Sequence, residues 1–289
     1  MELVSGQEMI GANPSVNSKW NLRRQTLAII VISVLLLAAM TVSGFLIENE
    51  KLSVNLEARN SSPSLDHLFG TDWLGRDMLA RTLKGLTLSF GVGLLTAFLS
   101  TIIALFLSLL SSWNKKIDHG VTWLIDLFIS MPHVVTLLLI SFAIGGGFKG
   151  VVTGIALTHW PSLTRLLRAE VMKVKTEQYI GVSRQLGKSR WWIACNHYLP
   201  HLMPQIMVGF ILLFPHTILH EAAITFLGFG LSPEQPAIGI ILSESMRYLS
   251  TGMWWLAFFP GLSLVIMVGI FDLLGNSIRK LIDPFHGQR

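Results

Sequence analysis

Apolar residues along this chain fall in long runs that alternate with polar segments. The first run, from Leu27 to Ile47, holds 21 residues without a charged side chain, enough for a helix to cross the hydrocarbon core of a bilayer. It is longer than the apolar part of a cleaved signal peptide, so we interpret it as a retained first span. Five further runs follow at 86–112, 120–144, 150–169, 199–227 and 254–276. The pattern predicts an all-α membrane protein with six transmembrane helices.

The composition agrees with a chain that lies mostly in lipid. Of its 289 residues 51% are apolar and only 13% are charged, and the mean hydropathy is +0.57. A soluble domain usually carries about twice that charged fraction. The single cysteine, Cys195, excludes an internal disulfide and a thiolate metal cluster. In a membrane protein the net charge of +5 indicates orientation rather than nucleic-acid binding.

Lysine and arginine are distributed unequally between alternate loops. In the six-span arrangement, 15 of the 22 lie on the side that holds both termini. Because positive side chains are retained in the cytoplasm, both termini are predicted to be cytoplasmic. The predicted segments are a cytoplasmic N-terminal segment 1–26, a first helix 27–47, an extracytoplasmic loop 48–85, a five-helix core 86–276 that includes the cytoplasmic loop 170–198, and a cytoplasmic tail 277–289.

The loop 170–198 is the largest predicted cytoplasmic segment. Its apolar residues have the spacing of a short amphipathic helix that is interrupted at Gly187. Such a helix can dock on a soluble partner, or it can lie on lipid headgroups with Trp191 and Trp192 as anchors. Gly187-Lys188-Ser189 does not end a phosphate-binding loop, because Val182 occupies the place of its first glycine. The chain is therefore expected to bind no ATP or other cofactor.

Histidines lie within the predicted spans. His216 and His220 are four residues apart in the fifth span, so they share one helical face, and Glu221 lies beside them. His159 lies near the middle of the fourth span and His133 near the middle of the third. Ionisable residues inside spans commonly mark transport paths, and imidazole suits nickel, cobalt, copper and zinc. The alternative is a histidine that only hydrogen-bonds to a neighbouring helix.

Other polar and helix-breaking residues occur at similar depth. Asp126 lies near the cytoplasmic end of the third span, where it can reach interfacial partners. Pro204 and Pro215 predict a fifth helix that is broken at membrane depth. In the fifth span the glutamate follows the second histidine instead of lying between the two, so this is not the H-E-x-x-H pattern of a metalloprotease. The chain is therefore not expected to be an enzyme.

Short sequence blocks stand in a fixed order over about residues 20–285. They are Gly70-Thr-Asp-Trp-Leu-Gly-Arg-Asp77, Asp126 six residues before Pro132, Gly187 followed by Leu199-Pro200, Phe226-Leu-Gly-Phe-Gly230 with Pro233, Pro236 and Gly239, and Leu273-Leu-Gly275 followed by Asp283-Pro284. In this order they resemble the permease subunits of ABC importers for dipeptides, oligopeptides and nickel. One block would carry little weight, but the ordered set covers nearly the whole chain.

The resemblance implies the type I ABC importer permease fold in the bacterial inner membrane. It further implies a heterodimer with a second permease subunit, two cytoplasmic ATPase subunits that use ATP, and an extracytoplasmic substrate-binding protein. The expected contact with an ATPase lies within 170–198, at Glu177, Gly181, Ser183, Gly187 and Arg190. Gly181-Val182-Ser183 stands where the family has Glu-Ala-Ala. Small residues remain for close docking, but any salt bridge of the missing glutamate is lost.

The expected cargo also follows from the resemblance. His159, His216 and His220 resemble positions at which nickel-type members carry histidine, whereas His133 has no such counterpart and is expected to be structural. We therefore expect nickel, cobalt or another transition metal, carried as a metallophore chelate rather than as a bare ion, which two histidine ligands would compensate poorly. These three histidines would be transient metal contacts, and Glu221 and Asp126 would line the pathway. The alternative cargo is a di- or oligopeptide. Rival classes are a secondary carrier driven by an ion gradient and a structural membrane scaffold.

Overall fold

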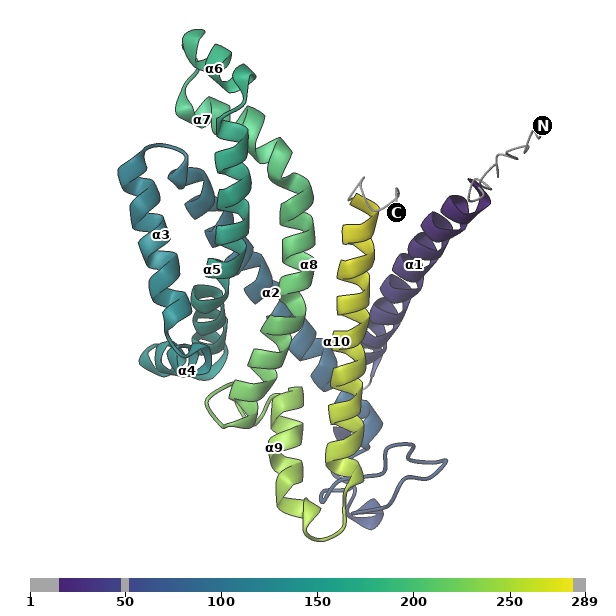
Figure 1. Cartoon of the computed structure of the whole chain (residues 1–289). Helices are drawn as coiled ribbons and strands as arrows, with labels where there is room; N and C mark the ends of the chain where they lie inside the picture. The colour runs from purple at the N-terminus through teal and green to yellow at the C-terminus, as the bar shows by residue number, and fades with distance from the viewer. Residues whose placement is uncertain (1–15, 48–51, 283–289) are drawn as a thin grey trace, which may run out of the picture.

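The long apolar runs of the chain form its longest helices (Figure 1). The computed structural model describes residues 16–47 and 52–282, and these ranges contain helices but no strand. The α-helices are α1 (Val16–Leu46), α2 (Met78–Ser111), α3 (Lys115–Ser130), α4 (His133–Ala143), α5 (Gly147–Lys175), α6 (Gln178–Gln185), α7 (Arg190–Ile193), α8 (Leu199–Phe226), α9 (Ile238–Leu249) and α10 (Trp255–Ile282). A 3-10 turn, η2 (Leu56–Ala58), precedes α2, and a π-helical turn, η3 (Ala194–Tyr198), joins α7 to α8.

Polar side chains fix where three of the helices begin. Asp77 accepts a hydrogen bond from the backbone N–H of Ala80 at the start of α2, at 2.9 Å. Asn114 caps α3 and Ser189 caps α7 in the same way. Each cap satisfies a backbone donor that the first helical turn leaves without a partner. As a result α2 begins at Met78, inside the predicted loop 48–85.

Four helical segments among the described residues are long and apolar enough to cross a membrane. They are Arg23–Leu46, Met78–Ser111, Arg190–Phe226 and Trp255–Ile282, and the bent pair of α3 and α4 makes a fifth if it counts as one span. They correspond to the predicted spans 27–47, 86–112, 199–227, 254–276 and 120–144. The count of six remains a prediction, because α5, at the predicted span 150–169, is long enough but too polar to meet the same criterion.

The third predicted span is wrong as a single helix. The chain bends by 100° between α3 and α4, at Met131 and Pro132. Met131 has an extended backbone conformation, which the ring of a following proline imposes because it clashes with a helical residue before it. The bend turns the first residue of α4, His133, toward α5 and α8. It therefore determines which side chains meet in the middle of the helical bundle.

The predicted break in the fifth span is also wrong. Pro204 and Pro215 both lie inside α8, which runs as one helix of 28 residues. Prolines are tolerated in membrane helices where neighbouring groups and small backbone adjustments compensate for the missing hydrogen bond. Pro215 is buried among the helices that pack on α8, namely α2, α5, α9 and α10.

Small residues allow α2 to pack closely against α5 and α8. Gly93 of α2 lies against Ile218, and its carbonyl accepts a hydrogen bond from the Thr217 hydroxyl at 3.0 Å. Ser100 donates to the carbonyl of Ala156 on α5 at 3.3 Å. Contacts of this kind are typical of membrane helices. Within lipid the hydrophobic effect does not drive helices together, so close van der Waals contact and hydrogen bonds between helices stabilise their packing instead. Helix α1 is instead mostly exposed and slants away from this centre (Figure 1).

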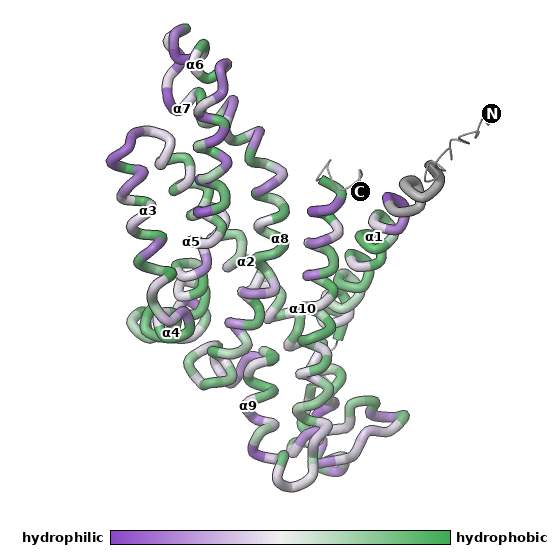
Figure 2. The backbone as a smooth tube through the Cα atoms, viewed as in Figure 1, coloured by the Kyte–Doolittle hydropathy of each residue, from purple (hydrophilic) through white to green (hydrophobic). Residues whose placement is uncertain are grey.

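The start of α1 and the end of α10 lie on the same side of the molecule as α6 and α7 (Figure 1). Figure 2 shows hydrophilic residues gathered on α6, at the start of α3 and at the end of α10. Helix α9 and the loop before α2 occupy the opposite end, so the predicted outer loop 228–253 contains a helix. The start of α1 and the end of α10 therefore lie at one end of the molecule, and the cytoplasmic location of the two termini stays a prediction. Residues 1–15 of the predicted N-terminal segment 1–26 lie outside the described residues. The same holds for residues 283–289 of the predicted tail 277–289.

Candidate functional site

The polar segment between α5 and α8 folds into two short helices. Helix α6 ends in a reversal at Gly187, whose φ of +75° is a conformation that residues with a Cβ rarely adopt. The N–H of Lys188 donates to the carbonyl of Ser183 at 3.1 Å, and the N–H of Gly187 donates to that of Arg184 at 3.0 Å. These two bonds form a Schellman motif, which satisfies the last carbonyls of a helix. The predicted interruption at Gly187 is confirmed.

One side of α6 packs on the protein and the other is exposed. Ile180 is fully buried, whereas the exposed fractions of Tyr179, Val182 and Leu186 are 45%, 54% and 72%. These three residues, which we call the α6 face, are spaced three and four apart and so form one stripe. The Tyr179 ring contacts that of His197, with centroids 5.4 Å apart, but more than half of the surface of Val182 and Leu186 is left open.

The predicted contact residues of this region have different surroundings. Gly181 is exposed, and a Cβ added there would meet no atom within 4 Å. Ser183 is partly buried and its hydroxyl lies 2.9 Å from Nε2 of His197. Glu177 occupies the N-cap position of α6 without forming a side-chain cap. Gly181 and Gly187 are therefore open to a partner, whereas Ser183 fixes the helix to the segment that follows.

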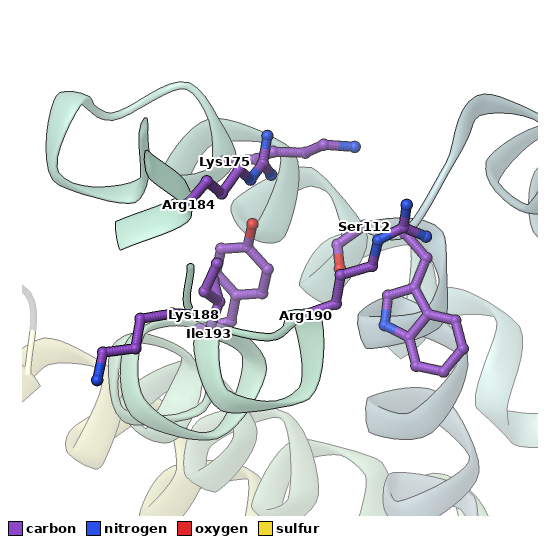
Figure 3. Close-up of a pocket in the computed structure, with 8 residues that line it drawn as sticks. Ser112, Lys175, Arg184, Lys188, Arg190 and Ile193 are labelled. Atoms are coloured by element: carbon purple, nitrogen blue, oxygen red, sulfur yellow. The ribbon is translucent and has the colours of Figure 1, made fainter. Parts of the chain in front are cut away.

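A cationic pocket lies beside α6 (Figure 3). It has a volume of about 290 Å³ and extends from Ser112 and Trp113 at the end of α2 to Tyr198. Its cations are Lys175, Arg184, Lys188 and the predicted contact residue Arg190. None of these four forms an ion pair with another residue in the described part of the chain. Burial, followed by the charge of Arg184, lowers the pKa of Lys175. The crowding of like charges suits this pocket to an anionic group.

Three histidines from different helices come together. They are His133 of α4, His159 of α5 and His220 of α8, and their ring centroids are 4.5 to 4.9 Å apart. We call them the three-histidine cluster. His216, one turn before His220, is exposed and lies outside the cluster. Of the predicted trio, the structure therefore brings His159 and His220 together, and their third neighbour is His133.

The two predicted carboxylates of the pathway lie apart from this cluster. Glu221 is fully buried on α8, where its Oε1 accepts a hydrogen bond from the Thr225 hydroxyl at 2.9 Å. Asp126 of α3 is exposed and forms an ion pair with Arg165 of α5 at 2.8 Å. Glu221 is thus enclosed within the helices, and Asp126 lies on an open surface beside a cation.

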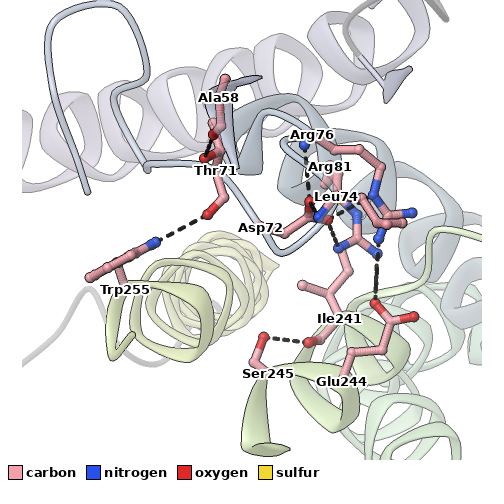
Figure 4. Close-up of polar contacts among 10 residues, drawn as sticks. All are labelled: Ala58, Thr71, Asp72, Leu74, Arg76, Arg81, Ile241, Glu244, Ser245 and Trp255. Atoms are coloured by element: carbon pink, nitrogen blue, oxygen red, sulfur yellow. Dashed lines mark hydrogen bonds and ion pairs between the residues drawn. The ribbon is translucent and has the colours of Figure 1, made fainter. Parts of the chain in front are cut away.

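Sequence reasoning missed an ion-pair network in the loop before α2 (Figure 4). Oδ2 of the fully buried Asp72 accepts hydrogen bonds from Arg76 at 2.7 Å and from Arg81 at 2.8 Å. Its Oδ1 accepts from the backbone N–H groups of Leu74 and Arg76, both at 2.9 Å. Arg81 also reaches Glu244 of α9 at 2.8 Å. The Gly-Thr-Asp-Trp-Leu-Gly-Arg-Asp block is the sequence signal of this network, because it contains Asp72 and Arg76.

Aromatic residues complete the attachment of this loop. Trp73 stacks on Tyr248 of α9 with ring centroids 4.7 Å apart, and the guanidinium groups of Arg76 and Arg81 lie 5.4 and 5.6 Å from the Trp73 ring. Trp255 of α10 donates from Nε1 to the carbonyl of Thr71 at 3.4 Å. The loop is thereby joined to α2, α9 and α10, and it forms an ordered outer cover instead of a free linker.

Comparison with known proteins identifies a family that this chain matches. Residues 97–286 match the family described as binding-protein-dependent transport system inner membrane component. A Brucella suis protein named as a peptide transport system permease is 28% identical over 277 residues, which are 95% of this chain and 93% of that protein. A second Brucella suis protein, named as a peptide permease, is 33% identical over 235 residues, 80% and 77% of the two chains.

Two further similarities cover much of the chain. The dipeptide transport system permease protein DppC of Bacillus subtilis is 28% identical over 266 residues, 91% of this chain and 83% of DppC. In a crystal structure of an amino acid ABC transporter with histidines, one chain is similar with a TM-score of 0.53 at 16% identity, covering 70% of this chain and 94% of that one. At this identity the structural similarity concerns the fold alone.

Proposed function

Because this chain belongs to the family of binding-protein-dependent transport system inner membrane components, we propose that it is the permease subunit of an ABC importer for di- or oligopeptides. It is a multi-pass protein of the inner membrane and a transport permease rather than an enzyme. The observation that carries the peptide assignment is the similarity to the dipeptide permease DppC over 91% of the chain. The names of the two Brucella suis relatives support the same cargo.

The peptide assignment replaces nickel as the preferred cargo. The nickel prediction rests on histidine positions alone, whereas the peptide assignment is supported by relatives aligned over most of the chain. Metal or metal-chelate import remains the second candidate, and the three-histidine cluster is the observation that favours it. Imidazole is a common ligand of nickel, cobalt, copper and zinc.

A cytoplasmic ATPase subunit is the proposed partner of the α6 face. The family implies ATPase and substrate-binding partners, and the matched segment includes α6 and α7. The apolar α6 face can fill a groove on the ATPase, while Arg184, Lys188 and Arg190 can attract acidic side chains around it. In this arrangement Glu177, Gly181, Ser183, Gly187 and Arg190 lie in or next to the contact, and the α6 end faces the cytoplasm. ATP-driven movement of the ATPase would reach the bundle through α5 and α8.

The remaining partners follow from the same proposal. A second permease subunit would complete the pathway as a heterodimer, because a single chain leaves the partly exposed side of the three-histidine cluster uncovered. The ordered cover formed by residues 52–77, α9 and the start of α10 would face the extracytoplasmic substrate-binding protein. These outer elements lie at the end of the molecule opposite α6 (Figure 1).

Uptake measurements separate the two cargo candidates. The complete importer is expressed, with and without this chain, in a bacterial strain that lacks its own peptide and nickel importers. We expect ATP-dependent uptake of radiolabelled di- and tripeptides only when the chain is present, and no change in the uptake of radiolabelled nickel or its histidine chelate. Nickel uptake that requires the chain, with peptide uptake unaffected, would move the assignment to the second candidate.

Reconstitution of the chain alone separates the importer from a secondary carrier. We expect liposomes that contain only this chain to accumulate no peptide when a proton or sodium gradient is imposed, because the energy source of an ABC importer lies in its ATPase subunits. The measurement is the uptake of labelled peptide over time, with the complete ATP-loaded importer as the positive control. Accumulation driven by a gradient in the absence of ATPase subunits would contradict the proposal.

A further inference from the structure

The nitrogens of the three-histidine cluster are close enough to share one ion. His133, His159 and His220 each offer one ring nitrogen, and these nitrogens all lie within 4.8 Å of one another. In a tetrahedral zinc site with metal–nitrogen bonds of about 2.0–2.1 Å, two ligand nitrogens are roughly 3.4 Å apart. Small side-chain rotations would therefore bring all three nitrogens into ligand positions without moving a helix.

Two of the rings are already oriented as metal ligands are. Nδ1 of His159 lies 3.0 Å from the carbonyl oxygen of Ile155, and Nδ1 of His220 lies 2.7 Å from that of His216. A carbonyl oxygen only accepts, so each Nδ1 carries the proton and each Nε2 keeps its lone pair. Metal-binding histidines typically donate their other N–H to a carbonyl or a carboxylate in this way.

Two nitrogens of the cluster are buried without a partner. They are Nε2 of His159 and Nδ1 of His133. A buried polar atom that forms no hydrogen bond destabilises a fold. Binding a ligand at such an atom would remove this cost. The rings of His159 and His220 both lie against the His133 ring, with centroids 4.5 and 4.7 Å away. His159 and His220 thus each have one nitrogen held by a backbone carbonyl and one available, and His133 contributes an Nδ1 without a partner.

We infer that His133, His159 and His220 form a binding site for a divalent transition-metal ion, with three imidazole nitrogens as ligands. The cluster contains no carboxylate, so its chemistry favours zinc, nickel, cobalt or copper over magnesium or calcium. His133 and His220 are only partly buried, so a fourth coordination position would open to the surface of the bundle. The ion would connect α4, α5 and α8. This inference is independent of which cargo the importer carries.

Metal binding to the complete importer in lipid nanodiscs tests the site. Zinc, nickel and cobalt are titrated in separate experiments, and affinity is measured by competition with a chromophoric chelator. We expect one ion for each copy of this chain. His159→Ala and His220→Ala should each weaken binding at least tenfold, since removing a ligand costs no less than removing the group that orients one. The visible absorption of bound cobalt should report a four-coordinate site with nitrogen ligands.

The matched control is His216→Ala. This histidine lies on the same helix, one turn from His220, and its backbone carbonyl, which contacts His220, is kept in the variant, so the variant should bind metal as the wild type does. If His159→Ala impairs assembly, His220→Ala still tests the site, because His220 is only partly buried and its replacement disturbs the packing less than that of the buried His159. The inference is overturned if the wild type binds no stoichiometric ion, or if His216→Ala weakens binding as much as His220→Ala. Because no transport is measured, failure here leaves the peptide assignment untouched.

Discussion

Replacing Asp72 with asparagine is expected to destabilise the outer part of the protein by about 3–5 kcal/mol. The carboxylate is fully buried and forms ion pairs with Arg76 and Arg81. Asparagine keeps the shape of the side chain and one hydrogen-bond acceptor but removes the negative charge. Only 6% of the Arg81 side chain is exposed, and Glu244 would remain as the only carboxylate paired with its guanidinium. An uncompensated buried charge is among the most destabilising changes known.

Thermal unfolding of the importer in nanodiscs and limited proteolysis of residues 52–77 measure this effect. The expected result is a lower unfolding temperature and faster cleavage of the loop. The control is Asp66→Asn, which makes the same change at an exposed position in the same loop and should alter stability by less than about 0.5 kcal/mol. If Asp72→Asn resists protease as well as Asp66→Asn, the network contributes nothing to the attachment of the loop.

Charge inserted into the α6 face is expected to separate the permease from its ATPase. Leu186→Asp places a carboxylate at a side chain that is 72% exposed and, in the proposed complex, buried in a groove. A few residues near the centre of an interface contribute about 2 kcal/mol or more each, and a buried carboxylate at such a position should weaken ATPase binding about 30-fold or more. ATP-dependent peptide uptake should fall with it. The folded chain should persist, because Leu186 contributes little to the bundle itself.

Co-purification of the ATPase with the permease, followed by uptake assays, provides the measurement. Leu65→Asp is the matched control, since it makes the same substitution at a leucine that is 94% exposed in the outer loop. The control should retain the ATPase fully. Retention of the ATPase by Leu186→Asp would instead favour the alternative interpretation of this segment, in which the α6 face lies on lipid headgroups beside Trp191 and Trp192.

The sequence predicted the elements that depend on local pattern. Apolar runs identified α1, α2, α8 and α10, and the glycine at 187 identified the break after α6, because helix formation and helix ends depend on neighbouring residues. Prolines were less informative. Pro132 coincides with a 100° bend, whereas Pro204 and Pro215 lie inside a continuous helix. The surroundings of each proline decide the outcome, and these are a property of the tertiary structure.

The candidate site was predictable only in part, for the same reason. Spacing along one helix placed His216 and His220 on a shared face, but it does not specify which helices lie opposite that face. His133 joins the cluster because the bend at Met131 and Pro132 directs the start of α4 inward. One of the two ion-pair partners of Arg81, Glu244, is likewise 163 residues away. Contacts between distant segments are determined by packing, on which a single sequence carries little information.

The polarity of α5 has a consequence for biosynthesis. This helix carries six charged side chains among its 29 residues, yet it lies against α2, α4 and α8 at the centre of the bundle. Each arginine or lysine opposes partitioning from the translocon into lipid, by about 2.5–3.5 kcal/mol at the helix centre and less toward its ends. As a membrane helix, α5 therefore depends on neighbours for insertion. Helices α2 and α4, on which α5 packs most extensively, precede it in the chain, so we expect α5 to insert against them first and to be enclosed once α8 has been delivered.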